Sequence, residues 1–469
     1  MGTRRAITPD HGRVVSLACE SRIYVFGAAL LIALTICSRT LGDRGGSHFM
    51  ASMTIAGVAY LLAVREVFRG WGARATQVFP RRAVLVGLVL AAVWHIEFLR
   101  LPAGADDDIH RYVWDGRLQR LGYNPYIVVP SDPAVATLHT QETRTLNNRD
   151  LPSLYPPGAE LFFRAVTAVH ESTFALKVAF VICDFAIALV LLDVLRKNGG
   201  RAHLVLVFAW NPLLAIEVAG SGHIDIVGGL LLLISVAALV RKWQTIAALA
   251  FGLAVAVKFL PIVLLPLYWK RIRIRDAAIA AAAVALLYVP FLDHGRIPWG
   301  SLGTYVMGFR FNGPLFAILH HVMPSQLLAE LALLAGLATA TWMRRQSLTT
   351  EGTELRRRNA TELSLGESMS IEAFAWPMAA SLLCAPVVFP WYLLWLLPFL
   401  TSASTWLIIV WTVSIIPTYL MWHLSRASGT WGTLPVWVMV VEYGCLAVAA
   451  AIIIFRRCRS ATVANPNEV

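Results

Sequence analysis

Long apolar runs recur along this chain of 469 residues, and they restrict its fold more than any other feature. The first three extend from Ile23 to Leu41, from Phe49 to Val67 and from Ala83 to Leu101. Each has about the twenty residues that an α-helix needs to cross a bilayer. Because the bilayer interior offers no water to the backbone, such runs fold as helices or as a closed barrel. We predict an all-α fold, a polytopic transmembrane helical bundle of about 12 to 14 helices, some of them short.

The net charge of +12 arises from 40 Lys and Arg residues against 28 Asp and Glu residues. The basic residues lie in short clusters between apolar runs, a pattern that membrane topology explains better than nucleic-acid binding, so no nucleic-acid partner is expected. The six cysteines show no CxxC spacing, so neither a disulfide framework nor a zinc site is predicted. By the positive-inside rule, the N-terminal segment lies in the cytoplasm because of Arg4, Arg5, Arg13 and Arg22.

From that orientation, the third apolar run leads outward into the longest polar stretch, residues 102–172. Acidic residues outnumber Lys and Arg there, as expected for a first extracytoplasmic loop. Residues 346–370 are polar and are predicted to form a cytoplasmic loop. Residues 1–469 as a whole are expected to be one multi-pass domain of the cell (plasma or inner) membrane. Spans expected after the first outward loop include Phe174 to Leu195, Ala202 to Val218 and Ile224 to Val240.

Two segments are too short for ordinary helical hairpins. The basic clusters Arg241-Lys242 and Lys270–Arg275 are separated by fewer than thirty residues, whereas a hairpin of two full spans needs about forty. Two short helices that meet at Lys258–Pro261 would fit this length. Residues 371–400 repeat the pattern, with a break at Pro386–Tyr392. Broken backbone at membrane depth is tolerated where it lines a cavity or is packed in protein, so Lys258 is expected to point into a cavity.

Three adjacent carboxylates, Asp106-Asp107-Asp108, begin the most unusual polar stretch of the first loop. If Asp108 caps a short helix, its side chain accepts hydrogen bonds from the free N–H groups of the first turn. Helical spacing then places Asp108, Arg111 and Asp115 on one face. A solvated loop with a capped helix is the alternative explanation. The opposite face is expected to dock on a membrane surface and comprises Ile109, Tyr112, Val113 and Gly116.

A second helix is predicted after Pro156 and Pro157, because paired prolines favour a helix start. We expect it to lie in the membrane interface, with Glu160 and Arg164 paired at i, i+4. Its apolar stripe comprises Leu161, Phe162, Ala165, Val166 and Val169.

Isolated polar residues fall on the same outward side as the acidic stretch. Each has its own structural explanation, since Lys258 can snorkel, His223 can cap a helix and Arg426 can anchor an interface. Asp184 lies well inside a span, where an acid usually faces a polar cavity. Their convergence on one side predicts an outward cavity that binds an anion at membrane depth. The converging residues are His223, Asp225, Lys258, Arg296, Arg310, His423 and Arg426.

The run Asp108–Gly116, followed by Gly122–Tyr126, resembles the first-loop signature of GT-C integral-membrane glycosyltransferases. More narrowly, the chain is similar to bacterial polyprenyl-phosphate-mannose-dependent mannosyltransferases, and the resemblance covers nearly its whole length. Other features stand where that family has them: Tyr155-Pro156-Pro157, Asp184, Lys258 before Pro261, and Pro390-Trp391-Tyr392.

The resemblance implies transfer of a hexose, with mannose as the expected sugar, from a polyprenyl-phosphate donor to a lipid or polysaccharide acceptor. The transfer would invert the anomeric centre on the extracytoplasmic face. Asp108 or Asp107 would be the general base, and a carboxylate beside two others has the raised proton affinity that suits this role. Asp108 is favoured because it precedes the apolar-x-Arg-Tyr run. Residues expected to bind substrate are Arg111, Tyr112, Tyr155, Asp184, His223, Asp225, Lys258 and Arg310.

No cofactor or metal ion is expected, because Arg or Lys can stabilise a lipid-phosphate leaving group. The triplet Asp106-Asp107-Asp108 nevertheless resembles the DxD metal site of soluble glycosyltransferases, which leaves a metal role open. A transporter or flippase for a lipid-linked sugar would need the same cavity, although the chain has no internal repeat of the kind that transporters show. A glycan polymerase or ligase is a third function. The expected partners are the sugar donor, a glycan or lipid-linked acceptor and the lipid bilayer.

Overall fold

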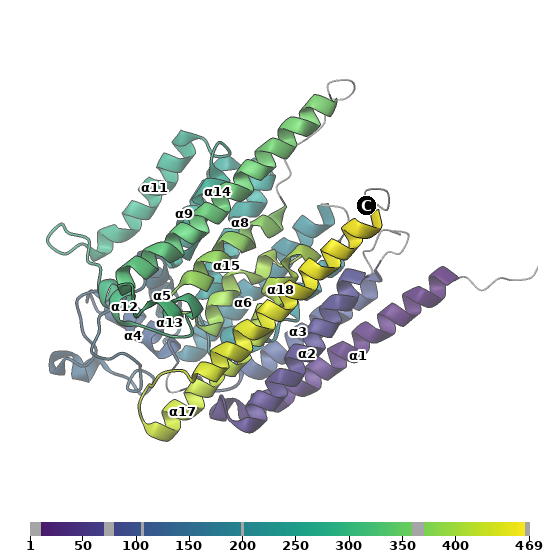
Figure 1. Cartoon of the computed structure of the whole chain (residues 1–469). Helices are drawn as coiled ribbons and strands as arrows, with labels where there is room; N and C mark the ends of the chain where they lie inside the picture. The colour runs from purple at the N-terminus through teal and green to yellow at the C-terminus, as the bar shows by residue number, and fades with distance from the viewer. Residues whose placement is uncertain (1–10, 70–78, 105–106, 198–200, 359–369, 465–469) are drawn as a thin grey trace, which may run out of the picture.

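The computed structural model describes residues 11–69, 79–104, 107–197, 201–358 and 370–464, and these residues form helices and loops with no β-strand among them. Figure 1 shows the long helices running side by side as one bundle. Eight helical segments are long and apolar enough to cross a membrane, or up to nine if one pair bent by 67° counts as a single span. The predicted all-α polytopic bundle is therefore confirmed among the described residues, and the chain is a multi-pass membrane protein.

Most spanning segments coincide with predicted apolar runs, but the predicted span Ile224 to Val240 forms a helix of only 16 residues, which is shorter than a full span. The spanning segments are carried by α1 (His11–Thr40), α2 (Ser47–Arg69), α3 (Arg81–Leu99), α6 (Thr173–Lys197), α11 (Ile274–Tyr288), α14 (Ser325–Arg358), α16 and α17 (Trp406–Ser414 and Leu420–Ser428), and α18 (Val436–Ala464). The bent pair consists of the helical residues Ala202–Ala209, which include α7 (Val205–Ala209), and the π-helical turn Leu214–Gly220. Three shorter apolar helices complete the interior: α8 (Asp225–Val240), α9 (Gln244–Val257) and the segment Ile371–Cys384, which includes α15 (Ala375–Cys384).

Short helices gather at one end of the bundle, which we call the loop end. It contains α4 (Ile109–Arg120), α5 (Pro157–Val169), α12 (Leu302–Gly308), α13 (Pro314–Leu319) and α17. Figure 1 shows that α14 and α18 end at the opposite pole, which we call the basic end because it carries Arg241-Lys242, Lys270–Arg275 and Arg344-Arg345. The spanning helices thus run between two chemically different poles.

The two predicted helix breaks are present. Helix α9 ends at Val257, and Lys258 is extended, with φ −161° and ψ 145°. A 3₁₀ turn over Leu260–Leu264 follows, where Pro261 supplies no N–H to continue the α-helix. Likewise α15 ends at Cys384, and the next helical turn begins at Pro390. Both breaks therefore follow from proline chemistry that can be read in the sequence.

The apolar face of α4 packs against protein, so the prediction that it docks on a membrane surface is wrong. Ile109, Tyr112, Val113 and Gly116 are all buried. A Cβ atom on Gly116 would lie 2.5 Å from the hydroxyl of Thr167 and 2.7 Å from a backbone oxygen of α5. This close approach requires glycine, and it locks α4 onto α5. Periodicity identifies an apolar face but does not say whether lipid or another helix covers it.

Helix α5 begins at Pro157, as predicted, but Glu160 does not pair with Arg164. Glu160 is buried and accepts hydrogen bonds from Ser153 (2.5 Å) and Gln119 (2.8 Å), whereas Arg164 is exposed. Burial raises the pKa of Glu160, and nearby Asp115 raises it further. A carboxyl with this environment takes neutral partners inside the protein in preference to a cation at the surface.

The stretch 346–370, predicted as a loop, is helical in its first part, because α14 continues to Arg358. Residues 359–369 lie outside the described part of the chain. Polar composition marked the end of the apolar run, but a helix that is already formed can continue past the membrane, because each further residue adds a hydrogen bond to the existing turn.

Candidate active site

Asp108 immediately precedes α4, and its backbone carbonyl accepts the amides of Arg111 and Tyr112 at 2.9 and 3.2 Å. Its side chain makes no capping hydrogen bond, contrary to the prediction. Instead, Oδ1 accepts from Asn147 Nδ2 at 2.7 Å and Oδ2 accepts from the Tyr155 hydroxyl at 3.3 Å. The carboxylate is half-buried. Both of these hydrogen-bond donors are neutral, so no cation bonds to Asp108 in these contacts.

Asp107 has a different environment. Arg44 donates to both of its oxygens at 2.8 and 3.2 Å, and the amide of Gly104 donates to one of them at 2.7 Å. Burial alone would raise the pKa of Asp107, but the Arg44 charge outweighs burial and holds it below its ordinary value. Asp107 therefore anchors the loop to the turn between α1 and α2. Asp106, the third member of the predicted triplet, lies outside the described residues.

An aromatic cluster packs next to Asp108. Tyr112 stacks on Phe163 of α5, with ring centroids 4.3 Å apart, and Tyr155 meets Tyr112 edge-on at 5.2 Å. The hydroxyl of Tyr155 donates to Asp108 and lies 3.5 Å from that of Tyr112. Burial raises the pKa of both tyrosines, and the Asp108 charge raises both further. Both phenols therefore remain protonated hydrogen-bond donors beside the carboxylate at neutral pH.

A second polar cluster forms where the two broken hairpins meet. Asp225, at the start of α8, accepts from Lys258 Nζ at 2.8 Å and from the indole N–H of Trp395 at 2.7 Å, both at Oδ1. The Lys258 ammonium also lies 4.0 Å from the centroid of the Tyr392 ring. The Asp225 side chain is 1% exposed, whereas that of Lys258 is 21% exposed. Lys258 is thus the more accessible member of the pair, and the expectation that it points into a cavity stays a prediction.

The two clusters are close neighbours in the fold. A Cβ atom on Gly222, three residues before Asp225, would lie 2.4 Å from the side chain of Ile109, the residue after Asp108. The hydroxyls of Tyr305 and Tyr392 share a hydrogen bond, and the Tyr392 ring lies against the Lys258 ammonium. The turn before α8 therefore packs directly on the start of α4.

His223 lies in the turn just before α8. Its ring stacks on Trp391 with centroids 4.0 Å apart, and its Nδ1 lies 2.9 Å from Oε2 of Glu217. Burial lowers the pKa of His223, but the Glu217 carboxylate outweighs burial and holds it above its ordinary value, with Asp108 contributing in the same direction. Glu217 and Trp391 thus hold the His223 ring in place.

Three other predicted site residues make contacts of their own. Asp184 of α6 pairs with His95 of α3 at 2.8 Å, across two spanning helices. Arg111 donates to Asp115 at 2.8 Å within α4. Arg310 bonds to main-chain oxygens of its own loop and lies over a phenylalanine ring. The structure therefore brings together Asp108, Tyr112, Tyr155, His223, Asp225 and Lys258, and it places Asp184, Arg111 and Arg310 in separate contacts.

Sequence reasoning missed Arg44, Asn147 and Trp395. Arg44 had a usable signal, because the turn between the first two spans was predicted to lie on the same outward side as the acidic loop. Trp395 lies four residues after Trp391 in the second broken hairpin, but nothing in the sequence pairs it with a residue 170 positions earlier. Among the described residues, no group of three or more His, Cys, Asp and Glu side chains is arranged to hold a metal ion.

Residues 19–272 match the family model described as alpha-(1->6)-mannopyranosyltransferase, N-terminal domain. The matched segment covers more than half of the chain and runs from within α1 to just past α10 (Leu265–Tyr268). It includes Asp108, both tyrosines beside it, Asp225 and Lys258. No curated protein and no solved structure matches the chain.

Proposed function

The chain belongs to the alpha-(1->6)-mannopyranosyltransferase family, and from that premise we propose how it acts. The protein transfers one mannose from a polyprenyl-phosphate donor to a glycan or lipid-linked acceptor. The reaction occurs at the loop end, on the extracytoplasmic face of the cell membrane, with inversion of the anomeric centre. The basic clusters at the opposite pole support this orientation, since cytoplasmic loops of membrane proteins carry the excess of Lys and Arg.

One observation carries the proposal: the Asp108 carboxylate, whose hydrogen-bond donors are neutral, and the accessible Lys258 ammonium lie in neighbouring polar clusters. Asp108 accepts the proton of the acceptor hydroxyl as general base. The acceptor oxygen bonds to the anomeric carbon from the side opposite the phosphate, and the bond from that carbon to the phosphate oxygen breaks. The electron pair leaves with the lipid phosphate, whose negative charge Lys258 stabilises.

Surrounding residues position these two groups. Tyr112 and Tyr155 are protonated donors that can bind sugar hydroxyls next to Asp108. Asp225 fixes the direction of Lys258, and Trp395 in turn fixes Asp225. Because the groups are held before substrate arrives, little reorganisation is needed at the moment of transfer.

The test is to incubate the purified protein with labelled polyprenyl-phosphate mannose and a mannan-type acceptor. We expect a labelled acceptor extended by one sugar. Movement of the labelled lipid across a vesicle membrane without transfer would indicate a flippase, and transfer of a whole glycan would indicate a ligase. Asp108→Asn should reduce turnover about a hundred- to ten-thousandfold. Asp132→Asn is the matched control, since Asp132 caps a turn of the same loop by accepting from Ala134 N. It should retain near-native turnover.

A further inference from the structure

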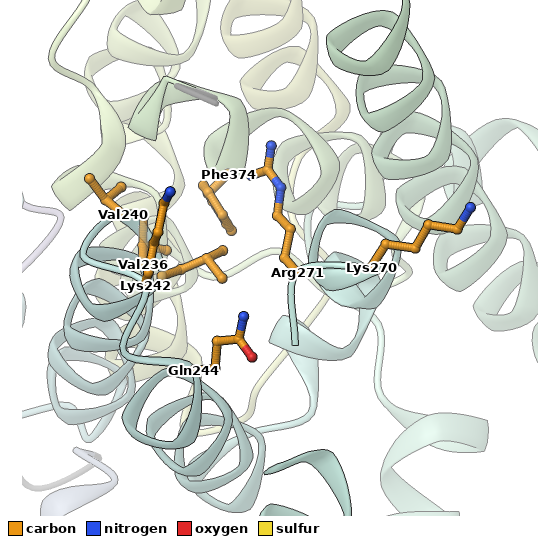
Figure 2. Close-up of a pocket in the computed structure, with 8 residues that line it drawn as sticks. Val236, Val240, Lys242, Gln244, Lys270, Arg271 and Phe374 are labelled. Carbon is orange, nitrogen blue, oxygen red and sulfur yellow. The ribbon is translucent and has the colours of Figure 1, made fainter. Parts of the chain in front are cut away.

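A cavity of about 250 Å³ opens at the basic end of the bundle, beside the turn that joins α8 to α9 (Figure 2). Its lining combines four apolar side chains, one amide and three cations, and it includes no carboxylate. The lining residues are Val236, Leu239, Val240, Lys242, Gln244, Lys270, Arg271 and Phe374. A cavity with this lining favours a ligand in which an anionic group is attached to an apolar group.

This cavity is separate from the candidate active site. Helix α8 begins at Asp225 and ends at Val240, which lines the cavity. At a rise of 1.5 Å per residue, its 16 residues span about 24 Å. The family reaction therefore gives no reason for these cations.

The backbone at the rim is unusual. Lys242 follows α8 with φ 62°, and Lys270 follows α10 (Leu265–Tyr268) with φ 60°. Lysine is uncommon in this left-handed region, where glycine and asparagine are favoured. Both turns would form more readily with glycine or asparagine, so the lysines at these two positions cost conformational free energy. Residues held in such a backbone conformation are often found at functional sites.

Exposed apolar side chains flank the basic rim. Trp243 and Trp269 are 57% and 68% exposed, and Val240 and Leu265 are 45% and 50% exposed. Tryptophan is enriched at the membrane–water interface. The cavity therefore lies at headgroup depth, with a lipid-facing surface directly beside it, and its ligand can offer phosphate to the cations and acyl chains to the apolar flank.

We propose that this cavity binds the phosphate headgroup of an anionic phospholipid from the leaflet at the basic end. Figure 2 shows the amide of Gln244 pointing into the space between Lys242 and Arg271, while the Lys270 side chain leads away from that space. The Gln244 amide offers both a donor and an acceptor to headgroup oxygens. Lys270 adds charge at the rim. Basic pockets between transmembrane helices recognise phospholipid headgroups by this chemistry.

The experiment measures lipid binding to the purified full-length protein in neutral detergent, by native mass spectrometry. The probes are dioctanoyl phosphatidylglycerol, dioctanoyl phosphatidylcholine and sodium phosphate as competitor. The test variant is Lys242→Asn with Lys270→Asn, because asparagine keeps the left-handed backbone and removes the charge. The matched control is Lys197→Gln with Arg345→Gln, which removes two exposed charges near the basic end that do not line the cavity.

We expect phosphatidylglycerol to bind in preference to phosphatidylcholine. Removing both lysines should weaken its binding about 25-fold, since each cation near a headgroup is worth about fivefold. The control should change binding less than about twofold. If the double variant is poorly folded, each single variant is measured, and each should lose about fivefold. Unchanged binding in the lysine variants, or an equal loss in the control, would overturn the proposal. Displacement of the lipid by millimolar phosphate would overturn the lipid as ligand and assign the cavity to free phosphate.

Discussion

Asp107→Asn should lower the stability of the protein, whereas Asp108→Asn should lower its turnover, although the two aspartates are neighbours. The Arg44 and Asp107 side chains are 4% and 3% exposed. Asp107→Asn leaves the Arg44 guanidinium buried without its counter-charge, which costs about 3–5 kcal/mol of stability. Asp108→Asn breaks at most one hydrogen bond, worth about 0.5–1.5 kcal/mol, because an amide oxygen can still accept from Asn147 or Tyr155.

Two measurements on each purified variant separate these effects: thermal unfolding in detergent and turnover of polyprenyl-phosphate mannose. Asp107→Asn should unfold at a clearly lower temperature. Asp108→Asn should unfold near wild type but lose turnover about a hundred- to ten-thousandfold. Arg44 holds the pKa of Asp107 below its ordinary value of 3.8. The stability from this pair is therefore fully present above that value and is lost as pH falls through the lower folded value. Asp107→Asn should lack this acid-dependent loss.

The control for the pairing of Asp107 with Arg44 is a double-mutant cycle that includes Arg44→Gln. If the two residues act as a pair, the double variant should be less destabilised than the sum of the single variants. One result would refute the reasoning: Asp107→Asn unfolding like wild type with no turnover, while Asp108→Asn stays active. Asp107 would then be the base, and the Arg44 contact would describe a state without substrate.

Three further outcomes are expected. Lys258→Met should weaken donor binding about 10- to 150-fold, which is the worth of a hydrogen bond to a charged group. Acceptor binding, measured in a paired titration, should stay unchanged. An equal loss for both substrates would remove Lys258 from the donor site. In a cysteine-free background, single cysteines at Thr140 and Ser347 should react with a membrane-impermeant reagent from opposite sides, and labelling from one side would overturn the orientation. Asp184→Asn should lower the unfolding temperature, because Asp184 pairs with His95, while the donor KM stays unchanged; a raised KM with native stability would return Asp184 to the substrate site.

Local chemistry made part of this protein predictable. The apolar runs gave the spans within a few residues, because each must contain about twenty residues to cross a bilayer. Pro261 and Pro390 marked both helix breaks, since proline cannot supply the N–H that continues an α-helix. The position of Lys258 at one break followed directly. These features depend on residues a few positions apart, and a sequence contains that information.

Partners distant in sequence were not predictable. Arg44 and Asp107 are 63 positions apart, and Trp395 is 170 positions from Asp225. The expected raising of carboxylate proton affinity by adjacent acids therefore failed for Asp107, where a cation from another turn lowers the pKa. The surroundings of α4 were missed for a related reason: a helix face of the right polarity can meet lipid or protein, and only the tertiary fold decides.

The broken hairpins explain how a cation can be both stable and available at membrane depth. An unpaired lysine there is costly, and Asp225 supplies the opposite charge. The ammonium has three donors. One is directed at Asp225, and one face of the group lies against the Tyr392 ring. The ammonium can therefore donate a further hydrogen bond to a phosphate oxygen while its ion pair with Asp225 stays intact. In an unbroken helix the Lys258 side chain would run along the helix surface. The extended conformation of Lys258 instead directs it to Asp225 of α8.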